Sequence, residues 1–422
     1  MEKTELKKSL QEIAGKSFYR KFILNLLNRF QKGEVELTFP EGETLKFGQG
    51  NGEKAQIQIK NEDFFKKCFY SGDIGFGESY TDGDWESYDL TQVIKWVIDN
   101  VENSGVLSGS QTQAQLFNFL EKFNRLQHLF KRNSKKQSRQ NISYHYDLSN
   151  DFYSHFLDPS MTYSCAHFKN SSESLEQAQM NKYEKICKSL DLKPGLQILE
   201  IGCGWGSFAA YAAQNYGVKV TGITLSKEQL RYARKKIKDE GLEKNIEFIL
   251  KDYRDMQGKF DRVVSIEMIE AVGDEYLETF FKKCSELLKK EGLLTLQAIT
   301  SPDSRYESFK KGVDWIQKHI FPGSLLPSIQ AMNSAANKTS DLQLFSLEDR
   351  GLHYAKTLRL WRERFHQNFP KIKPLGFDEE FKRKWHYYLS YCEAAFFKRN
   401  ISDVQLTFIR PNNRTVHNNY NF

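Results

Sequence analysis

The stretch Ile198-Leu199-Glu200-Ile201-Gly202-Cys203-Gly204-Trp205-Gly206-Ser207 decides the fold. An apolar run from Leu196 to Ile201 ends at three alternating glycines, and a helix-compatible segment from Phe208 to Gln214 follows. This order is typical of the strand, tight turn and helix that open an α/β sheet, whose ligands bind beyond the carboxyl ends of the strands. Glycine lets the chain turn sharply and lets the backbone approach a ligand closely. The pattern is G-x-G-x-G, which differs from the G-x-G-x-x-G of dinucleotide-binding proteins.

Four more apolar segments follow the glycine turn and alternate with helix-compatible stretches. They span Lys219 to Thr224, Ile246 to Lys251, Phe260 to Ile266 and Gly292 to Ile299. Alternation at this spacing predicts right-handed βαβ units. The expected fold class is therefore α/β, a Rossmann-like domain with a mostly parallel sheet and helices on both faces. A late strand at the edge of this sheet is expected at Val404 to Arg410.

Polar motifs stand at the carboxyl end of each predicted strand, where an α/β sheet binds its ligand. The second strand ends in Thr224-Leu225-Ser226-Lys227-Glu228-Gln229, in which Ser226 can cap the next helix and Gln229 can complete a capping box. The third, fourth and fifth strands run into Asp252-Tyr253, Glu267 to Glu270, and Gln297 to Thr300. We expect these side chains to gather around one site.

The 422 residues exceed the ~250–300 at which a single core usually stops growing, so two domains are expected. Residues 1–100 are predicted to form a smaller N-terminal α+β accessory domain, with a helix in Lys16 to Phe30 and short strands in Glu34 to Ile59. Phe69 to Tyr80 and the following Gly83-Asp84-Trp85 are interpreted as a loop-rich surface. Residues 139–422 are predicted to hold the α/β domain, with a helix from Ser174 to Leu190 before its first strand.

Residues 101–138 are predicted to be a linker that contains a basic amphipathic helix. Apolar side chains recur at helical spacing from Leu116 to Phe130, and five basic residues follow without an acid: Lys131, Arg132, Lys135, Lys136 and Arg139. Such a helix can lie on an anionic membrane surface. It can equally pack on the main domain with a solvated basic end, and the sequence leaves both interpretations open.

Charge and composition narrow the class of protein further. The formal net charge is +7, a mild bias that suits an anionic partner. The sequence has no apolar run of ~18 residues that could span a bilayer, and Met1 to Gly15 has no signal-peptide core, so a cytoplasmic protein is expected. The six cysteines are scattered without metal-ligand spacing, which predicts reduced thiols and no metal site.

The glycine turn with Glu200 two residues before it resembles motif I of S-adenosylmethionine-dependent methyltransferases. The run from Asn141 through Arg410 resembles the cyclopropane-fatty-acyl-phospholipid synthase family. The motifs that carry this resemblance are Tyr144-His145-Tyr146-Asp147, Tyr163-Ser164-Cys165-Ala166, Glu200 to Gly206, Thr224-Leu225-Ser226 with Gln229, Asp252-Tyr253-Arg254-Asp255, Ile320-Phe321-Pro322-Gly323 with Leu326-Pro327-Ser328, and Tyr387-Tyr388-Leu389 before Cys392.

The resemblance implies a reaction and a cofactor. In this family a methyl group passes from S-adenosylmethionine to the double bond of an unsaturated acyl chain, often within a phospholipid bilayer, and loss of a proton closes a cyclopropane ring. Tyr163, Ser164, Glu200, Gly202, Gly204 and Gly206 would hold the methionine and ribose parts of the cofactor. Thr224 and Gln229 would reach the ribose hydroxyls, and Asp252 with Tyr253 would reach the adenine. Because an alkene is a weak nucleophile, positioning and exclusion of water must supply most of the catalysis.

The resemblance also implies a bicarbonate ion as the base, in a nest of side chains and backbone. Cys165, Glu270, Ile299 and Tyr354 match four places of this nest, whereas Gln297 stands at the place of its histidine. Glu267 stands where the better-known synthases have a small residue. Two carboxylates this close would repel bicarbonate or raise one pKa, so that Glu267 or Glu270 could itself be the base.

One further family residue has a doubtful role here. Cys392 matches a cysteine to which the family has often assigned an active-site role, although no chemical step requires a covalent thiol. A buried structural cysteine is the simpler interpretation, and the same holds for Cys203.

Several functions stay open at this point. The variant pattern also resembles relatives that make methylene- or methyl-branched acyl chains. A methyltransferase for a soluble small molecule, a nucleic-acid methyltransferase and a non-enzymatic lipid-surface protein are alternatives, although no amine-methylating or nucleic-acid-binding motif is seen. The expected partners are unsaturated phospholipid acyl chains at the membrane surface and no nucleic acid, with a homodimer compatible with this interpretation. The expected localisation is cytoplasmic and peripherally membrane-associated.

Overall fold

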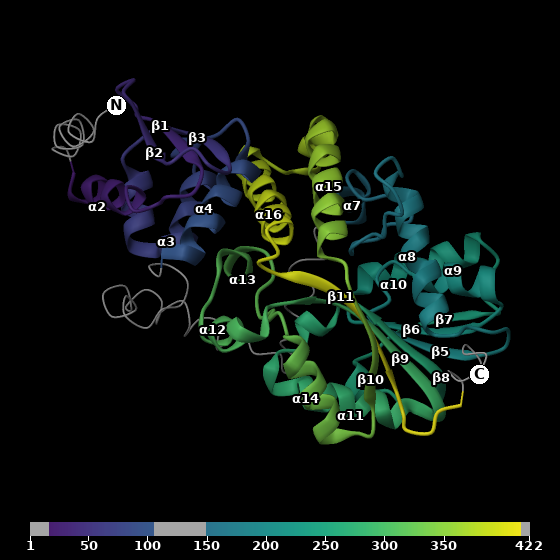
Figure 1. Cartoon of the computed structure of the whole chain (residues 1–422). Helices are drawn as coiled ribbons and strands as arrows, with labels where there is room; N and C mark the ends of the chain where they lie inside the picture. The colour runs from purple at the N-terminus through teal and green to yellow at the C-terminus, as the bar shows by residue number, and fades with distance from the viewer. Residues whose placement is uncertain (1–16, 105–148, 415–422) are drawn as a thin grey trace. The chain divides into compact units, whose positions relative to one another are not determined.

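The computed structural model describes residues 17–104 and 149–414 (Figure 1). The chain divides into two compact units. The first unit comprises Met1–Gln127, Gly312–His319 and Gly376–Asn400, and the second comprises His128–Lys311, Ile320–Leu375 and Ile401–Phe422.

The second unit is built on a seven-stranded sheet in the order β10-β11-β9-β8-β5-β6-β7. Its strands are β5 (Gln197–Ile201), β6 (Lys219–Thr224), β7 (Ile246–Leu250), β8 (Phe260–Ile266), β9 (Leu288–Thr300), β10 (Gln343–Asp349) and β11 (Ser402–Ile409). The strands β5 to β9 pair parallel among themselves, and β11 pairs antiparallel with both β9 and β10. The predicted mostly parallel α/β sheet is confirmed.

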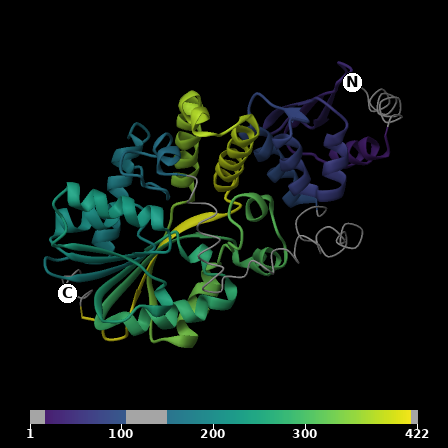
Figure 2. The ribbon, with the colours of Figure 1, turned by 180° about the vertical axis from the view of Figure 1, so that it is seen from behind.

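Helices cover both faces of this sheet, as Figure 1 and, from behind, Figure 2 show. On one face lie α8 (Leu175–Ser189), α9 (Ser207–Tyr216) and α10 (Lys227–Asp239), and on the other lie α11 (Leu277–Leu287) and α14 (Ile329–Thr339). Each layer encloses its own apolar core: Ile186, Phe208 and Ile237 belong to one, and Phe280, Leu294 and Met332 belong to the other. The near-continuous burial of β5 and β8 follows from this double coverage.

The remaining helices of the second unit are α7 (Asn150–Ser154), α12 (Tyr306–Lys311) and α15 (Gly351–Ile372), with the 3₁₀ turns η2 (Tyr253–Asp255), η3 (Ile269–Ala271), η4 (Asp274–Tyr276), η5 (Asp303–Arg305) and η6 (Lys373–Leu375). The turn between β5 and α9 requires glycine because Gly202, Gly204 and Gly206 have φ values of 84°, 53° and 87°, in the left-handed region. Sharp reversal at this turn brings the carboxyl end of β5 directly against the start of α9.

The late strand was predicted at the edge of the sheet, and this prediction is wrong. β11 lies between β9 and β10, and β10 forms the edge. The strand β10 was not predicted, because its side chains are mostly exposed or half-buried and show no clean alternation of burial. A bulge between Leu344 and Ser346 breaks the two-residue period further.

The first unit is an α+β unit with a four-stranded sheet in the order β2-β1-β3-β4. Its strands are β1 (Glu34–Thr38), β2 (Thr44–Gly48), β3 (Lys54–Ile59) and β4 (Trp85–Glu86), and its helices are α2 (Phe18–Leu27), α3 (Asp63–Thr81), α4 (Leu90–Ser104), α13 (Trp315–His319) and α16 (Glu379–Phe397). The predicted helix in Lys16 to Phe30 and strands in Glu34 to Ile59 are observed.

The interpretation of Phe69 to Tyr80 as a loop-rich surface is wrong, because these residues belong to α3, which is kinked at Gly72. The other glycines of this helix serve close packing rather than turns. A Cβ atom at Gly75 would lie 2.0 Å from the Lys67 carbonyl oxygen, and one at Gly77 would lie 2.5 Å from the Trp315 indole. Glycine in a helix therefore marks a crowded contact here.

The predicted boundary of the α/β domain, residues 139–422, also differs from the structure. Gly312–His319 and Gly376–Asn400 belong to the first unit, because α16 packs on α3 and α4. Lys398, just beyond α16, contacts the carboxylates of Glu53 and Asp99 at 2.7 Å each. A strictly linear domain boundary could not include these returning segments.

The linker predicted for residues 101–138 begins too early, because α4 extends to Ser104. Two predicted features lie outside the described residues: the basic amphipathic helix from Leu116 to Phe130 with its flank to Arg139, and the Tyr144-His145-Tyr146-Asp147 motif. Within the ranges 17–104 and 149–414, no helix combines the length and apolar character needed to cross a membrane.

Candidate active site

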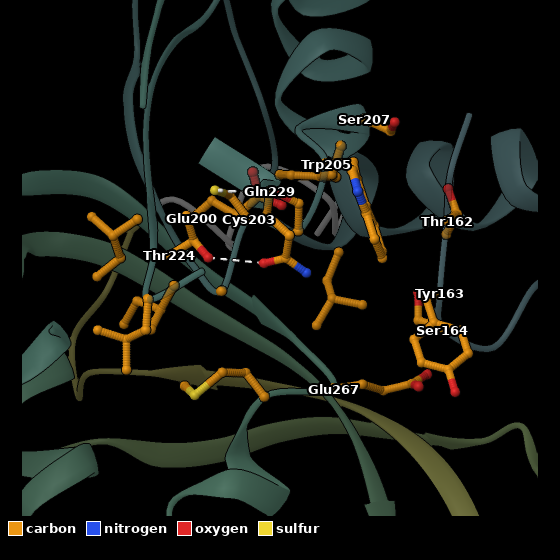
Figure 3. A pocket seen from close by; sticks show the side chains of 18 of the residues that line it. Thr162, Tyr163, Ser164, Glu200, Cys203, Trp205, Ser207, Thr224, Gln229 and Glu267 are labelled. Carbon is orange, nitrogen blue, oxygen red and sulfur yellow. Dashed lines mark hydrogen bonds between the residues drawn. The ribbon is translucent and has the colours of Figure 1, made fainter. Parts of the chain in front are cut away.

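A pocket opens at the carboxyl ends of β5, β6 and β8 in the second unit (Figure 3). Eight of the ten residues predicted to bind the cofactor line it: Tyr163, Ser164, Glu200, Gly202, Gly204, Thr224, Gln229 and Tyr253. Glu267, Met268 and Trp205 line it as well. In Figure 3 the Glu267 carboxylate lies toward Tyr163 and Ser164, away from Thr224 and Gln229.

The three glycines of the turn have different surroundings. A Cβ atom at Gly204 would meet no atom within 4 Å, so the backbone there is open to the pocket. At Gly202 it would lie 2.8 Å from the Met268 side chain, and at Gly206 it would lie 2.7 Å from the Phe248 ring. Gly206 does not line the pocket. Its role in the structure is tight packing at the start of α9.

Two buried polar atoms of the pocket make no hydrogen bond to the described residues. They are Oε2 of Glu200 and the hydroxyl of Tyr253. Burial raises the pKa of the Glu200 carboxyl well above its ordinary value. Such a carboxyl is suited to a ligand that brings a positive charge and hydrogen-bond donors. S-adenosylmethionine, with its ammonium and ribose hydroxyls, fits these groups and the open backbone at Gly204.

Thr224 and Gln229 form one unit at the end of β6. The Thr224 hydroxyl donates to Oε1 of Gln229 at 2.8 Å, the contact drawn between them in Figure 3. The Ser226 hydroxyl caps α10 by accepting from the Gln229 backbone N–H. The return bond of a capping box is not made, because the Ser226 N–H donates to the Thr224 hydroxyl instead. The Gln229 side chain thus lies in the pocket.

Asp252 does not line the pocket. Its carboxylate accepts from the Arg254 backbone N–H at 2.9 Å and pairs with the Arg254 guanidinium at 2.6 Å. This pairing fixes the turn that carries Tyr253, which does line the pocket. The structure therefore places Asp252 behind the predicted adenine end rather than on its surface.

Two residues of α8 that the sequence analysis missed hold the Tyr163-Ser164 segment. Lys182 donates to the Ser164 hydroxyl at 2.6 Å, and the Gln179 side chain donates to the Ser164 carbonyl at 3.0 Å. Both side chains are fully buried, and burial lowers the pKa of the Lys182 ammonium to about 8. The available signal was a polar pair, three residues apart, on the apolar face of a predicted helix.

The Glu267 carboxylate is bound by three donors from three separate segments. Oε1 accepts from the Cys165 backbone N–H and from the Gln297 side chain, both at 2.7 Å, and Oε2 accepts from the Tyr354 hydroxyl at 2.6 Å. Burial raises the pKa of Glu267, and these hydrogen bonds oppose that shift. Glu267 also has a φ of 49°, which is uncommon for a residue other than glycine. The strained backbone directs its carboxylate into this nest.

Gln297 has a fixed orientation because both ends of its amide are bound. Its oxygen accepts from the Arg350 guanidinium at 3.2 Å, and its nitrogen donates to Glu267. The same Arg350 nitrogen donates to Oε1 of Gln405 at 3.0 Å. Arg350, which is buried, was missed by the sequence analysis, because nothing in the surrounding sequence distinguishes it from a surface arginine.

Glu270 lies beside this nest and accepts from the Ile299 backbone N–H, the remaining donor that was predicted to bind bicarbonate. Its Oε1 accepts from the Ile299 backbone N–H at 2.5 Å, while its Oε2 makes no hydrogen bond to the described residues. Burial, followed by the negative charge of Glu267, raises the pKa of Glu270 to about 8. Four donors predicted for bicarbonate, from Cys165, Gln297, Tyr354 and Ile299, thus all contact protein carboxylates.

The cysteines provide no activated thiolate. Cys165 is buried beside the nest and contributes its backbone N–H, while burial raises the pKa of its thiol. Cys392 lies on α16 of the first unit and does not line the pocket, and burial raises its thiol pKa too. A protonated thiol is a weak nucleophile. Cys203 contacts the apolar core behind the glycine turn, as a packing residue does.

Aromatic rings gather next to the Glu267 nest. The Tyr163 ring lies 5.1 Å from Trp361 and 5.4 Å from Tyr153, and Tyr354 meets Trp361 edge to face at 6.0 Å. Such a wall excludes water and offers negative ring faces to a developing positive charge. A cofactor pocket, a buried carboxylate and an aromatic wall together suit the transfer of an electrophilic group followed by loss of a proton.

The fold and this site define an S-adenosylmethionine-dependent methyltransferase. Residues 133–406 match the family model described as mycolic acid cyclopropane synthetase. The chain therefore belongs to this family, and the resemblance seen in the sequence is confirmed.

Individual relatives agree with this assignment. The chain is 40% identical over 346 residues to tuberculostearic acid methyltransferase UfaA1 of Mycobacterium tuberculosis, covering 80% of this chain and 79% of that protein. It is also 40% identical over 365 residues to cyclopropane-fatty-acyl-phospholipid synthase of Escherichia coli K12, covering 84% and 88%. Among solved structures, mycolic acid cyclopropane synthase CmaA1 complexed with SAH and CTAB matches with a TM-score of 0.59 and 32% identity, covering 64% of this chain and 97% of that one.

Proposed function

We propose that the protein transfers a methylene group from S-adenosylmethionine to the double bond of unsaturated acyl chains in phospholipids, giving a cyclopropane ring. The relative from Escherichia coli is named for this reaction and is similar along most of both chains. The observation that carries the proposal is the half-buried Glu267 carboxylate, which lines the cofactor pocket and lies in a nest of three donors. A carboxylate so placed can receive the proton that ring closure releases.

The pocket residues would hold the cofactor as follows. Glu200 and the open backbone at Gly204 would bind the amino acid and ribose parts, and Thr224 with Gln229 would bind ribose hydroxyls. Tyr253 would contact the adenine, with Asp252 supporting it through Arg254. When bound, S-adenosylmethionine supplies an electrophilic methyl group. Tyr163 and Ser164, held by Lys182, would line the methyl end.

Glu267 would serve as the base in place of bicarbonate. The alkene would form a bond to the transferred carbon as the bond from that carbon to sulfur breaks, leaving a positive charge on the acyl chain. Glu267 would take one proton from the transferred carbon, and the electrons of that C–H bond would close the ring. Glu270, whose pKa lies near 8, would stay protonated at neutral pH and thereby leave the negative charge on Glu267.

A second product is favoured by a specific observation. The relative UfaA1 is named for tuberculostearic acid, and the place of the bicarbonate-site histidine is taken by Gln297 here. If the base removed a proton from a neighbouring carbon of the acyl chain, a methyl-branched alkene would form without ring closure. If a hydride first shifted from the methylated carbon to the cationic carbon, loss of a proton from the transferred carbon would give a methylene branch. A methyl-branched alkene or a methylene-branched acyl chain is therefore the alternative product of the same site.

The protein is further proposed to act at the membrane surface as a peripheral protein. The substrate's acyl chains lie in bilayers, and no helix in the described ranges could span one. A homodimer is proposed as well, supported by the exposed apolar side chains of Phe345 and Leu347 on the edge strand β10. Light scattering of the purified chain would test the dimer.

The function is tested with S-adenosylmethionine carrying a ¹³C-labelled methyl group and vesicles of unsaturated phospholipid. Mass spectrometry should find the label in acyl chains, and NMR separates the products, because the labelled carbon carries alkene protons in a methylene branch and ring protons in a cyclopropane. Label that appeared in a soluble small molecule or in added RNA, and not in lipid, would overturn the proposal.

A further inference from the structure

Five aromatic side chains form a cluster on the surface of the first unit, at α2 and the start of α3. This aromatic surface cluster comprises Phe18, Tyr19, Phe22, Phe69 and Tyr70. Phe69 lies at its centre, 5.5 Å from Phe18 and 4.9 Å from Phe22. The Tyr19 and Tyr70 hydroxyls are joined at 2.7 Å. Phe18 is 68% exposed, Tyr70 43% and Phe22 37%, so large apolar area faces solvent here.

The outward face of α2 combines these rings with positive charge. Lys21 and Arg29 are exposed on that face with Asn25 and Asn28, and α2 contains neither aspartate nor glutamate. Lys66 of α3 is exposed and acts electrostatically on Tyr70. The exposed acids of α3 nearest the cluster are Asp63, three residues before Lys66, and Asp73, three residues beyond Tyr70. Aromatic side chains therefore alternate with bases over one helix face.

The inner face of α2 differs from its outer face, because its basic residue is paired with carboxylates. Arg20, which points inward, is fully buried and pairs with Glu62 at 3.1 Å and Glu41 at 3.4 Å. Lys21, Arg29 and Lys66, in contrast, make no ion pair with the described residues. The unit thus neutralises its inward base and leaves its outward bases available to an external anion.

We propose that the aromatic surface cluster is the face on which the first unit docks to a bilayer that contains anionic phospholipids. Exposed aromatic side chains insert into a bilayer at the level of the lipid headgroups, and lysine and arginine beside them attract anionic headgroups. The inference rests on the proposed function, which places the substrate in a bilayer. It adds the location and the lipid charge that the function alone does not specify.

A first experiment places a reporter in the cluster of the full-length chain. Phe18→Trp is compared with Tyr88→Trp, because Tyr88 is 99% exposed and lies on the loop between β4 and α4 of the same unit. Vesicles contain unsaturated phosphatidylglycerol and phosphatidylcholine with brominated acyl chains. The bromines should quench the fluorescence of the Phe18→Trp variant and leave the added signal of Tyr88→Trp unchanged. If the Phe18→Trp protein bound the vesicles but the bromines did not quench the introduced tryptophan, the proposal would be overturned.

A second experiment removes the cluster's apolar area and charge separately. Phe18→Ser with Phe22→Ser should weaken co-sedimentation with these vesicles about tenfold or more. Lys21→Gln with Lys66→Gln should weaken it about fivefold per charge at low salt, and less at high salt. The matched control is Lys235→Gln with Lys238→Gln, which removes two exposed charges from α10 of the second unit. Equal loss in the control and the cluster variants would overturn the proposal.

Turnover separates this inference from the proposed function. The cluster variants should keep full turnover on phospholipid dispersed in detergent and lose it only on vesicles. If the parent showed no turnover on any lipid but the variants still lost vesicle binding, the function would fail and the docking face would stand. If Phe18→Ser with Phe22→Ser halved the mass in light scattering and left vesicle binding intact, the face would be a contact between two copies, and the proposal would be wrong.

Discussion

The Tyr354 hydroxyl donates a hydrogen bond of 2.6 Å to Oε2 of Glu267, across 87 residues of sequence. With the Cys165 N–H and the Gln297 amide on the other oxygen, it gives this half-buried carboxylate three fixed donors. Hydrogen bonds to the carboxylate favour its ionised form, and burial favours its protonated form. The two effects oppose each other, so the pKa of Glu267 is raised but the carboxylate can still accept a proton and release it again.

Replacement of Glu267 by glutamine should abolish most of the activity. The amide keeps the shape of the side chain but cannot accept a proton, so turnover should fall by about 10²- to 10⁴-fold. Affinity for S-adenosylmethionine, measured by calorimetric titration, should change little. Turnover is measured as labelled methyl incorporated into lipid.

Added bicarbonate serves as the control for this prediction. The parent protein should be insensitive to bicarbonate, because its donors already contact Glu267 and Glu270. A parent that required bicarbonate, together with full turnover in Glu267→Gln, would show that the glutamate is not the base. Introducing Gln297→His into the parent and into Glu267→Gln tests whether the histidine alone makes turnover depend on bicarbonate.

The raised pKa of Glu270 predicts a pH dependence of stability. The pKa is about 8 in the folded protein, against an ordinary value of 4.5. Between these values the folded state holds a proton that the unfolded chain has released, so the free energy of unfolding falls as pH rises, by about 1.4 kcal/mol per pH unit from this group. The contribution is fully present below 4.5 and is lost as pH rises through 8.

Urea denaturation of the parent and of Glu270→Gln at about pH 5 and about pH 7.5 measures this term, since other titrating groups are common to both. The glutamine variant should lose much less stability than the parent over this interval. Identical losses in both proteins would mean that Glu270 is ionised in the folded state across the whole range.

Much of the α/β sheet was predictable because its strands are largely buried and their apolar residues alternate with helix-compatible stretches at regular spacing. The strands β6 and β8 were located with the observed bounds, although each contains polar residues. The edge strand β10 has no such signal, and α3 was obscured because its glycines resemble turn residues. Their role is close packing against Lys67 and Trp315, and such contacts are fixed only by the tertiary structure.

Site residues could be predicted where they directly follow a strand, but not where they hold another site residue in place. Thr224, Glu267 and Glu270 stand at strand ends, where the ligands of an α/β sheet bind, so they could be predicted as candidate site residues. Lys182 and Arg350 lie on a helix face and at a helix start, and they act by holding Ser164 and Gln297. Their importance comes from burial beside a polar partner distant in sequence, which no local pattern records.

Arg350 is predicted to be a positioning residue for Gln297. Arg350→Met removes the donor that holds the Gln297 oxygen, so the amide can rotate and its nitrogen leaves Glu267 part of the time. Turnover should fall about tenfold, and the pKa that governs turnover at acidic pH should rise, because the ionised form of Glu267 loses a hydrogen bond. The pH profile of turnover is the measurement.

The control for Arg350 is Gln405→Leu, which removes the other acceptor of the same guanidinium nitrogen and leaves Gln297 in place. Its pH profile should match that of the parent. If Arg350→Met shifted only the urea midpoint and left the pH profile unchanged, Arg350 would have a structural role alone.

The last prediction compares two glycines that differ only in what they face. Gly204 in the turn after β5 and Gly195 before β5 both have positive φ values, 53° and 83°, and an added Cβ would meet no atom within 4 Å at either position. Gly204 lines the pocket and Gly195 does not. Valine at either position should cost about 1–2 kcal/mol of stability, because the left-handed conformation disfavours a branched side chain. Only Gly204→Val should lose affinity for S-adenosylmethionine in calorimetric titration, since its side chain would enter the space that the ligand needs. Equal affinities in the two variants would show that the cofactor does not approach this backbone, and the assignment of the pocket would have to be abandoned.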